Sequence, residues 1–167
     1  MGDAASAPGS ASDSSWRSNL VTDPGRIADI AQRALSVAVL GIKPEDRADQ
    51  PAHFVAAYIQ AAGVRVVPVP TFYPDITSIL GESVVRDLAD VPRVDILDVF
   101  RRPSDIAAHV PEILAMPNRP GCVWLQSGCG APDAEEALAR AGLLVIADKC
   151  LMVEHRAAMA AAGAAKL

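Results

Sequence analysis

Apolar residues gather in five short, nearly continuous runs along the chain. These runs are "SVAVLGI", "VRVVPVP", "VDILDVF", "GCVWLQS" and "LLVIAD", which begin at positions 36, 64, 94, 121 and 143. Runs without a polar face are typical of strands in a parallel sheet that is covered on both sides. Pro68 and Pro70 in the second run lack a backbone N–H, so we expect that strand to fray or kink near its carboxyl end.

Segments with helical periodicity separate these runs. Asp23 is a candidate N-cap for the first helix, Pro24 suits its first position, and Gly63 is expected to end the second helix. Pro111 must lie in an early turn of the third helix or kink it. The helical segments are residues 22–35, 51–63, 102–116, 131–142 and 153–166.

Strands that alternate with helices predict an α/β fold with a doubly wound, mainly parallel sheet of five to six strands and helices on both faces. Residues 71–92 have a mixed pattern, and we expect a loop, a short strand around 84–85 and a helical turn there. Residues 1–15 are small and polar and are predicted to form a disordered tail. Residues 16–167 are then one domain.

Composition narrows the possible partners. The 167 residues carry a formal net charge of −5, which argues against nucleic acid and acidic membranes as partners. No apolar stretch approaches the ~20 residues of a membrane span. Three cysteines at unrelated spacings indicate neither a disulfide framework nor a zinc site, so we expect no metal and a reduced, cytoplasmic location.

Candidate binding residues follow the strands. Open α/β sheets bind ligands at the carboxyl ends of their strands, near the point where the strand order reverses. The planar guanidinium groups of arginine and the N-termini of helices both bind phosphate, so their presence at such an edge favours a phosphorylated, nucleotide-like ligand. The alternative for any single charge is a solvated loop residue, in some cases paired with Asp46, Asp49 or Asp105. The cations after predicted strands are Lys43, Arg47, Arg101, Arg102 and Lys149.

Several of these blocks resemble a known family. The segments 37–70, "VDILDVFRRPSDI", "VWLQSG" and "GLLVIADKCLMVEH" are similar to the small bacterial CoA-binding proteins, over about residues 20–156. Those proteins look like the N-terminal CoA-binding domain of the succinyl-CoA synthetase α subunit. The resemblance implies a Rossmann-like sheet with coenzyme A across its carboxyl edge.

The resemblance also implies roles for the loop after the first strand. Gly41, Ile42 and Lys43 would lie against the nucleotide phosphates, with Arg47 close by. The dinucleotide fingerprint G-x-G-x-x-G is absent, because this loop has a single glycine.

Further contacts are implied at the ends of the next strands. Val99, Phe100 and Arg101 would line the adenine and ribose side, and Arg102 would lie near phosphate. Gln126 would lie beside the path of the pantetheine chain.

The sequence departs from the family pattern in three places. The family's V-N-P step appears as Val69 and Pro70 preceded by another proline, so its asparagine is missing or replaced. Residues 127–130 differ from the family's usual "WLQ-L-G" continuation. The usual D-R-C has Lys149 in place of arginine, which keeps the charge.

No catalytic residue is predicted. His53, His109 and His155 lie on predicted helices without a paired nucleophile, so we expect structural roles for them. The resemblance implies CoA binding without the synthetase reaction. Cys129 and Cys150 follow strand ends on the same edge, where a thiol could exchange with the thiol of CoA. The alternative for both cysteines is an ordinary packing role.

Two other functions stay open. An NAD(P)-dependent oxidoreductase would share the fold, although Gly41 stands alone and no acidic residue ends the run at 64–70 to bind a ribose hydroxyl. A non-catalytic interaction subunit with a vestigial nucleotide site is the other. The apolar closing helix could support a homodimer.

Overall fold

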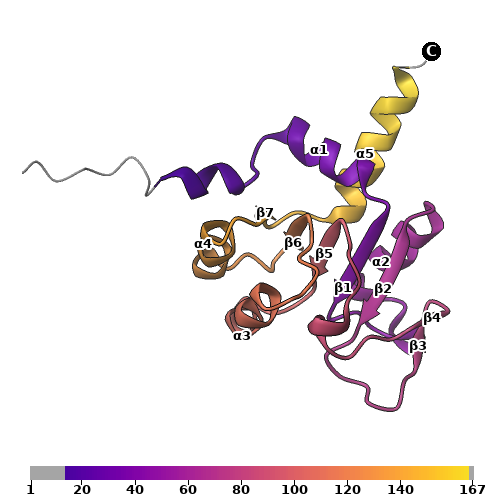
Figure 1. Ribbon diagram of the computed structural model, residues 1–167. Helices are drawn as coiled ribbons and strands as arrows, with labels where there is room; N and C mark the ends of the chain where they lie inside the picture. Colours follow the sequence, from indigo (N-terminus) through magenta and orange to yellow (C-terminus); the bar gives the residue numbers. More distant parts are fainter. Residues whose placement is uncertain (1–13, 166–167) are drawn as a thin grey trace, which may run out of the picture.

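The computed structural model describes residues 14–165 and places a five-stranded parallel sheet at the centre of the chain (Figure 1). The strand order is β2-β1-β5-β6-β7. The chain first winds outward from β1 to β2, and it then returns to the other side of β1, so the order reverses between β1 and β5. The predicted Rossmann-like, doubly wound fold is confirmed. The strands are β1 Ser36–Leu40, β2 Arg65–Val69, β5 Ile96–Val99, β6 Cys122–Leu125 and β7 Leu144–Ile146.

Helices cover both faces of this sheet. Asp23 accepts a hydrogen bond from the backbone N–H of Arg26 at 2.8 Å, so it caps the first helix as predicted. Gly63 adopts a φ of 91° just after Ala62, the C-cap residue of the second helix, as expected of a helix stop. The helices are α1 Pro24–Arg33, α2 Pro51–Ala61, α3 Pro103–Leu114, α4 Pro132–Arg140 and α5 Leu151–Ala164, with short 3₁₀ helices η1 Ser15–Asn19, η2 Glu45–Arg47 and η3 Leu88–Asp90.

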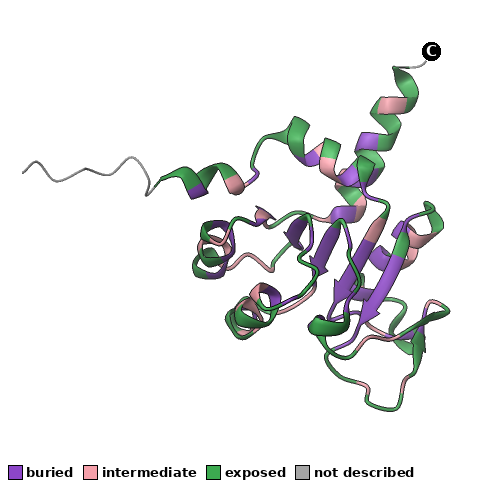
Figure 2. Ribbon diagram, in the orientation of Figure 1, coloured by how far each residue is buried: buried purple, intermediate pink, exposed green. Residues whose placement is uncertain are grey.

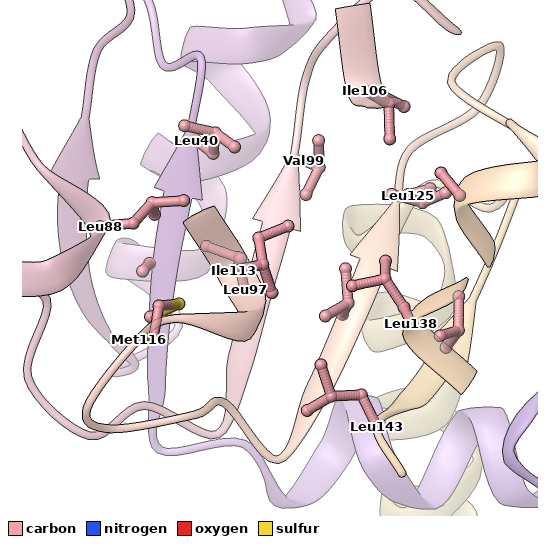
Figure 3. Packing of buried hydrophobic residues seen from close by; sticks show 14 of the residues in the cluster. Leu40, Leu88, Leu97, Val99, Ile106, Ile113, Met116, Leu125, Leu138 and Leu143 are labelled. Atoms are coloured by element: carbon pink, nitrogen blue, oxygen red, sulfur yellow. The ribbon is translucent and has the colours of Figure 1, made fainter. Parts of the chain in front are cut away.

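The core has two layers, one on each face of the sheet. On one face, α3 and α4 pack Ile106, Ile113 and Leu138 against the strands (Figure 3). On the other face, α1, α2 and α5 pack residues that include Ile27 and Ile59. The central strands are therefore buried on both sides, as Figure 2 shows, which explains why their sequences are continuous apolar runs.

The second strand tolerates its prolines without fraying. Pro68 lies in register opposite Val39, and β2 is the edge strand of the sheet. The next residue, Val69, points its carbonyl at β1 and accepts from Gly41 N–H at 2.9 Å. Pro68 therefore faces the outer edge, where no N–H is needed, and its carbonyl accepts from Val85 N–H at 2.8 Å. The prediction that this strand frays is wrong, because its pairing with β1 continues through Pro68 to Val69, and Pro70 follows the last paired residue.

Three smaller expectations shift in position. The short strand expected around 84–85 is a hairpin of β3 Ser78–Ile79 and β4 Glu82–Ser83. Pro111 lies inside α3 rather than in an early turn. The closing helix α5 begins two residues before its predicted start.

Residues 1–13 of the predicted tail, which spans 1–15, lie outside the described residues. Ser15, the last residue of that predicted tail, begins η1. Within the described part of the chain, every helix is too short or too polar to cross a membrane.

Candidate functional site

The glycine after β1 sits where the strand order reverses. Gly41 has a φ of 86°, and a Cβ atom built on it would lie 2.2 Å from the carbonyl oxygen of Phe100. The backbone N–H of Phe100 in turn donates to the carbonyl of Leu40 at 2.9 Å. The chain after β5 thus passes directly over Gly41, and both the turn and the close approach require glycine.

The rest of this loop is tied to the start of α2. The side chain of Ile42 is 1% exposed and belongs to the core. The backbone N–H of Lys43 donates to Ala52 at 3.2 Å, and His53 Nδ1 lies 2.8 Å from the Lys43 carbonyl oxygen. The ammonium group of Lys43 lies 5.4 Å from the centre of the Tyr73 ring. Arg47 is exposed on η2.

A cavity of about 550 Å³, which we call the edge pocket, opens beside this loop. It receives residues from the N-terminus of α2, the ends of β5 and β6, and the start of α5. Its lining therefore combines two guanidinium groups with largely apolar walls and two thiols. The lining residues are Gln50, Pro51, Ala52, Phe54, Val55, Phe100, Arg101, Arg102, Pro103, Gln126, Ser127, Gly128, Cys129, Cys150 and Met152.

A second cavity of about 750 Å³ lies at the end of β2. Val69 and Pro70 line this β2-end cavity, together with residues of the following loop and of α3. Arg86 shapes the loop by donating to the carbonyls of Phe72 and Tyr73 at 3.1 and 2.9 Å, and to that of Ile76. Of the predicted contacts, Phe100, Arg101, Arg102 and Gln126 line the edge pocket, and Val69 and Pro70 line the β2-end cavity. The others, which line neither cavity, are Gly41, Ile42, Lys43, Arg47 and Val99.

Arg101 connects residues of the two cavities. Its Nη1 donates to Thr71 Oγ1 at 3.0 Å, and its Nε donates to His109 Nε2 at 3.1 Å. His109 Nδ1 lies 2.7 Å from a carboxylate oxygen of Glu112. Because Nε2 accepts from arginine, Nδ1 carries the proton and donates to Glu112. Thr71, His109 and Glu112 line the β2-end cavity, so this network fixes the guanidinium of Arg101 between the cavities.

Arg102 is held differently. It forms a two-pronged contact with Asp105, at 2.8 and 3.3 Å, on the first turn of α3. The hydrogen bond from Arg102 lowers the pKa of the Asp105 carboxyl. The side chain of Arg102 is 81% exposed, so its guanidinium remains within reach of an incoming anion.

Sequence reasoning missed a buried acid beneath the edge pocket. Asp98 is 1% exposed in the middle of β5, and Gln126 Nε2 donates to its two carboxylate oxygens at 2.8 and 3.0 Å. Burial raises the pKa of Asp98 to about 7, although the bonds from Gln126 and the Val99 backbone act in the opposite direction. The available signal was an acidic residue inside the apolar run "VDILDVF".

The two thiols lie on loops that are bonded together. Asp148, with a φ of 59°, accepts from the backbone N–H of Gly128 at 2.7 Å. Trp124 Nε1 donates to the carbonyl of Lys149 at 2.8 Å. Partial burial, with the charges of nearby Asp98 and Asp148, raises the pKa of the Cys129 thiol. Cys150 is the N-cap residue of α5.

Val99 and His155 are buried and hydrogen-bonded within the fold. Val99 is fully buried, and its carbonyl accepts from Gln126 N–H at 3.3 Å. His155 is buried on α5, where its Nδ1 lies 3.1 Å from the hydroxyl of Tyr58. The free cysteines of the described chain are Cys122, Cys129 and Cys150.

Comparison with known proteins agrees with this architecture. A solved Thermus thermophilus protein, cell-free ID.343, is 43% identical with a TM-score of 0.72, and the match covers 82% of this chain and 99% of that one. A hypothetical protein from Pyrococcus horikoshii OT3 is 25% identical with a TM-score of 0.71, covering 83% and 93%. The uncharacterized protein YneT of Bacillus subtilis is 34% identical over 130 residues, which are 77% of this chain and 91% of that protein.

The match that identifies the family covers most of the domain. The sequence pattern of the CoA binding domain fits residues 35–156, from the start of β1 into α5. This range includes the edge pocket and the β2-end cavity, and it confirms the resemblance seen in the sequence. The chain belongs to the family of CoA binding domains.

Proposed function

We propose that the chain binds coenzyme A or an acyl-CoA in the edge pocket and has no catalytic activity of its own. The observation that carries this proposal is the composition of the edge pocket at the carboxyl ends of β5 and β6. Guanidinium groups suit phosphates, aromatic side chains suit a purine base, and apolar walls suit a pantetheine chain. Membership of the CoA binding domain family supports the same ligand.

The polar ends of the ligand would be divided among named residues. Arg101, Arg102 and Lys43 would hold phosphates, Phe100 would contact the adenine, and Gln126 would face the pantetheine chain. The N-terminus of α2 forms part of the pocket wall, where its dipole would add a partial positive charge.

The other predicted contacts would have smaller parts. Gly41 and Ile42 would contribute backbone alone, because one has no side chain and the other is buried. Val69 and Pro70 would contact a ligand that extends from the edge pocket into the β2-end cavity. Arg47 would act at longer range from η2.

Ligand titration tests the proposal against its rivals. The melting temperature should rise with CoA or acetyl-CoA, because a ligand that binds only the folded state stabilises it. Stabilisation by NAD or NADP but not by CoA would indicate the oxidoreductase. No shift with any of the four would favour the interaction subunit with a vestigial site.

Substitution of Arg101 tests the site. Arg101→Gln removes a charge-assisted contact worth about 1.5–3 kcal/mol, so CoA affinity should fall about 10- to 150-fold. Arg33→Gln is the matched control, because Arg33 is 79% exposed at the end of α1 and pairs with Asp29. Equal affinities in both variants would remove Arg101 from the site.

We further propose that a pocket thiol exchanges with CoA disulfide. A cysteine thiolate attacks one sulfur, a mixed protein–CoA disulfide forms, and the second CoA leaves as its thiolate. Cys150 is favoured over Cys129, because burial and two carboxylates disfavour a thiolate at Cys129. Intact mass after incubation with CoA disulfide should show one adduct that Cys150→Ser removes. An adduct that persists in a Cys129→Ser, Cys150→Ser double variant would contradict this.

A cytoplasmic location and a homodimer complete the proposal. Three free cysteines suit a reducing compartment. The exposed Val153 and Met159 on α5 are apolar surface that a second copy could cover. Fractionation of cells and light scattering of the purified chain test these two points separately.

A further inference from the structure

Within residues 14–165, a carboxyl group is buried under the edge pocket without a cationic partner. Asp98 is 1% exposed, and the strand register places Val39 and Trp124 beside it. Its side-chain contact within residues 14–165 is the amide of Gln126. A buried carboxylate is costly unless its oxygens accept hydrogen bonds, so the amide nitrogen is directed at Asp98 by electrostatics.

Gln126 connects this acid to the pocket. Gln126 is 3% exposed and lines the edge pocket, and its side-chain nitrogen donates to Asp98. Its carbonyl oxygen Oε1 has no hydrogen-bond partner among the described residues. Among the described residues, the fully buried polar side-chain atom without a hydrogen-bond partner is Trp16 Nε1. Gln126 Oε1 is therefore not fully buried, and it is open to the pocket that Gln126 lines. With Asp98 ionised, the pocket therefore offers a hydrogen-bond acceptor.

Protonation of Asp98 reverses this arrangement. A protonated carboxyl carries an O–H donor, which finds its acceptor when the Gln126 amide rotates and turns Oε1 toward it. The NH₂ group then faces the pocket and offers a donor. Because burial brings the pKa of Asp98 to about 7, both arrangements are populated near neutral pH.

We propose that Asp98 is a positioning residue that sets, through its protonation state, whether Gln126 offers the edge pocket an acceptor or a donor. The ionised form selects a ligand that presents an N–H group, such as a secondary amide of the pantetheine chain. This inference rests on the proposed binding of CoA and specifies which hydrogen-bonding group of the site recognises the ligand. Binding and loss of the Asp98 proton are then linked.

The linkage has a definite sign and size. If the ligand binds only the form with ionised Asp98, the apparent dissociation constant is the intrinsic one divided by the ionised fraction. With half-ionisation near pH 7, affinity should rise about tenfold from pH 6 to pH 8. At pH 7 about half a proton should leave the protein for each ligand bound.

Other titrating groups must be separated from Asp98. The phosphate monoester of CoA titrates near pH 6, and the ligand's contribution is common to all protein variants. The charged and titratable groups that surround Asp98 are also present in every variant, so their contribution to the pH dependence is common to all. These groups are Arg26 of α1, His53 and Tyr58 of α2, Cys122 of β6, Arg101, Cys129, Asp148, Cys150, and Glu154 and His155 of α5.

Calorimetric titration with acetyl-CoA tests the inference, since this ligand has no free thiol. Wild type and Asp98→Asn are titrated at pH 6, 7 and 8 in two buffers of different ionisation enthalpy. The wild type should gain about tenfold more affinity than the variant over this range, and release about half a proton more at pH 7. The asparagine side chain of the variant cannot ionise, and its amide pairs with Gln126 at every pH.

A second variant covers the case in which Asp98→Asn does not fold. Gln126→Met keeps the volume and the acid but removes the carbonyl oxygen, so its pH dependence should match the ligand's alone. The same pH dependence in the wild type and in either variant would overturn the inference while CoA binding stands. Affinity that falls from pH 6 to pH 8 specifically in the wild type would also overturn it. Absence of acetyl-CoA binding by the wild type would instead overturn the proposed function, and the inference with it.

Discussion

Replacing Asp98 by asparagine should change how the stability of the protein depends on pH. The pKa of the carboxyl rises from 3.8 to about 7 on folding, because burial disfavours the charged form. Between these values the folded protein holds a proton that the unfolded chain has lost. The contribution of protonated Asp98 to the free energy of unfolding is therefore fully present below about pH 4, and it is lost as the pH rises to about 7 and above.

The size of the effect follows from the same two values. At about 1.36 kcal/mol for each pKa unit, full ionisation costs about 4 kcal/mol, and the part that falls between pH 5 and pH 8 is about 2.5 kcal/mol. The neutral asparagine of the variant carries no such cost. The free energy of unfolding of the wild type, relative to Asp98→Asn, should therefore drop by about 2.5 kcal/mol over this interval.

Urea denaturation at pH 5 and pH 8 measures this difference. With a slope of about 2 kcal/mol per molar urea, the midpoints of the two proteins should diverge by about 1 M on going from pH 5 to pH 8. Burial lowers the pKa of His155, but that histidine is common to both proteins and cancels. Asp29→Asn, at an exposed carboxyl on α1, should show no such divergence. Parallel pH profiles for wild type and Asp98→Asn would refute the reasoning.

Three further changes test how the scaffold is held. Gly41→Ala should cost more than about 3 kcal/mol by urea denaturation, because φ is positive and a backbone carbonyl lies 2.2 Å from the new Cβ; Gly63→Ala, with open space around it, should cost about 1 kcal/mol. Asp23→Ala should lower the free energy of unfolding by about 1 kcal/mol through loss of an N-cap, and an unchanged value would mean that water replaces the cap. Arg86→Ala should speed amide hydrogen exchange in residues 72–76, where it donates to several carbonyls, and unaltered exchange would show that the loop holds itself.

The sheet was predictable because burial on both faces leaves a clear trace in the sequence. Strands such as β5 and β6 are covered by helices on each side, so their residues are apolar at almost every position. The edge strand β2 was harder to predict. Whether Pro68 breaks a strand depends on which side of β2 its nitrogen faces, and that is set by pairing with β1.

The site was predictable in location but less so in detail. The rule about strand ends placed the cations on one edge, yet side-chain directions depend on distant partners. Arg101 is fixed by Thr71 and His109, whereas Lys43 turns toward Tyr73. Asp98 lies on the same face of β5 as Ile96, and both faces of this strand are buried, so an acid inside this apolar run could have been identified as buried.

The contact between Gly41 and the chain after β5 bears on how related sequences are read. The glycine is required by the backbone of Phe100, which passes within the space that any side chain would occupy. A descendant of this chain that had lost its ligand would face the same steric demand and would keep the glycine. Glycine at this position therefore marks the fold, while retention of Arg101 and Gln126, whose side chains line the pocket, marks a working site.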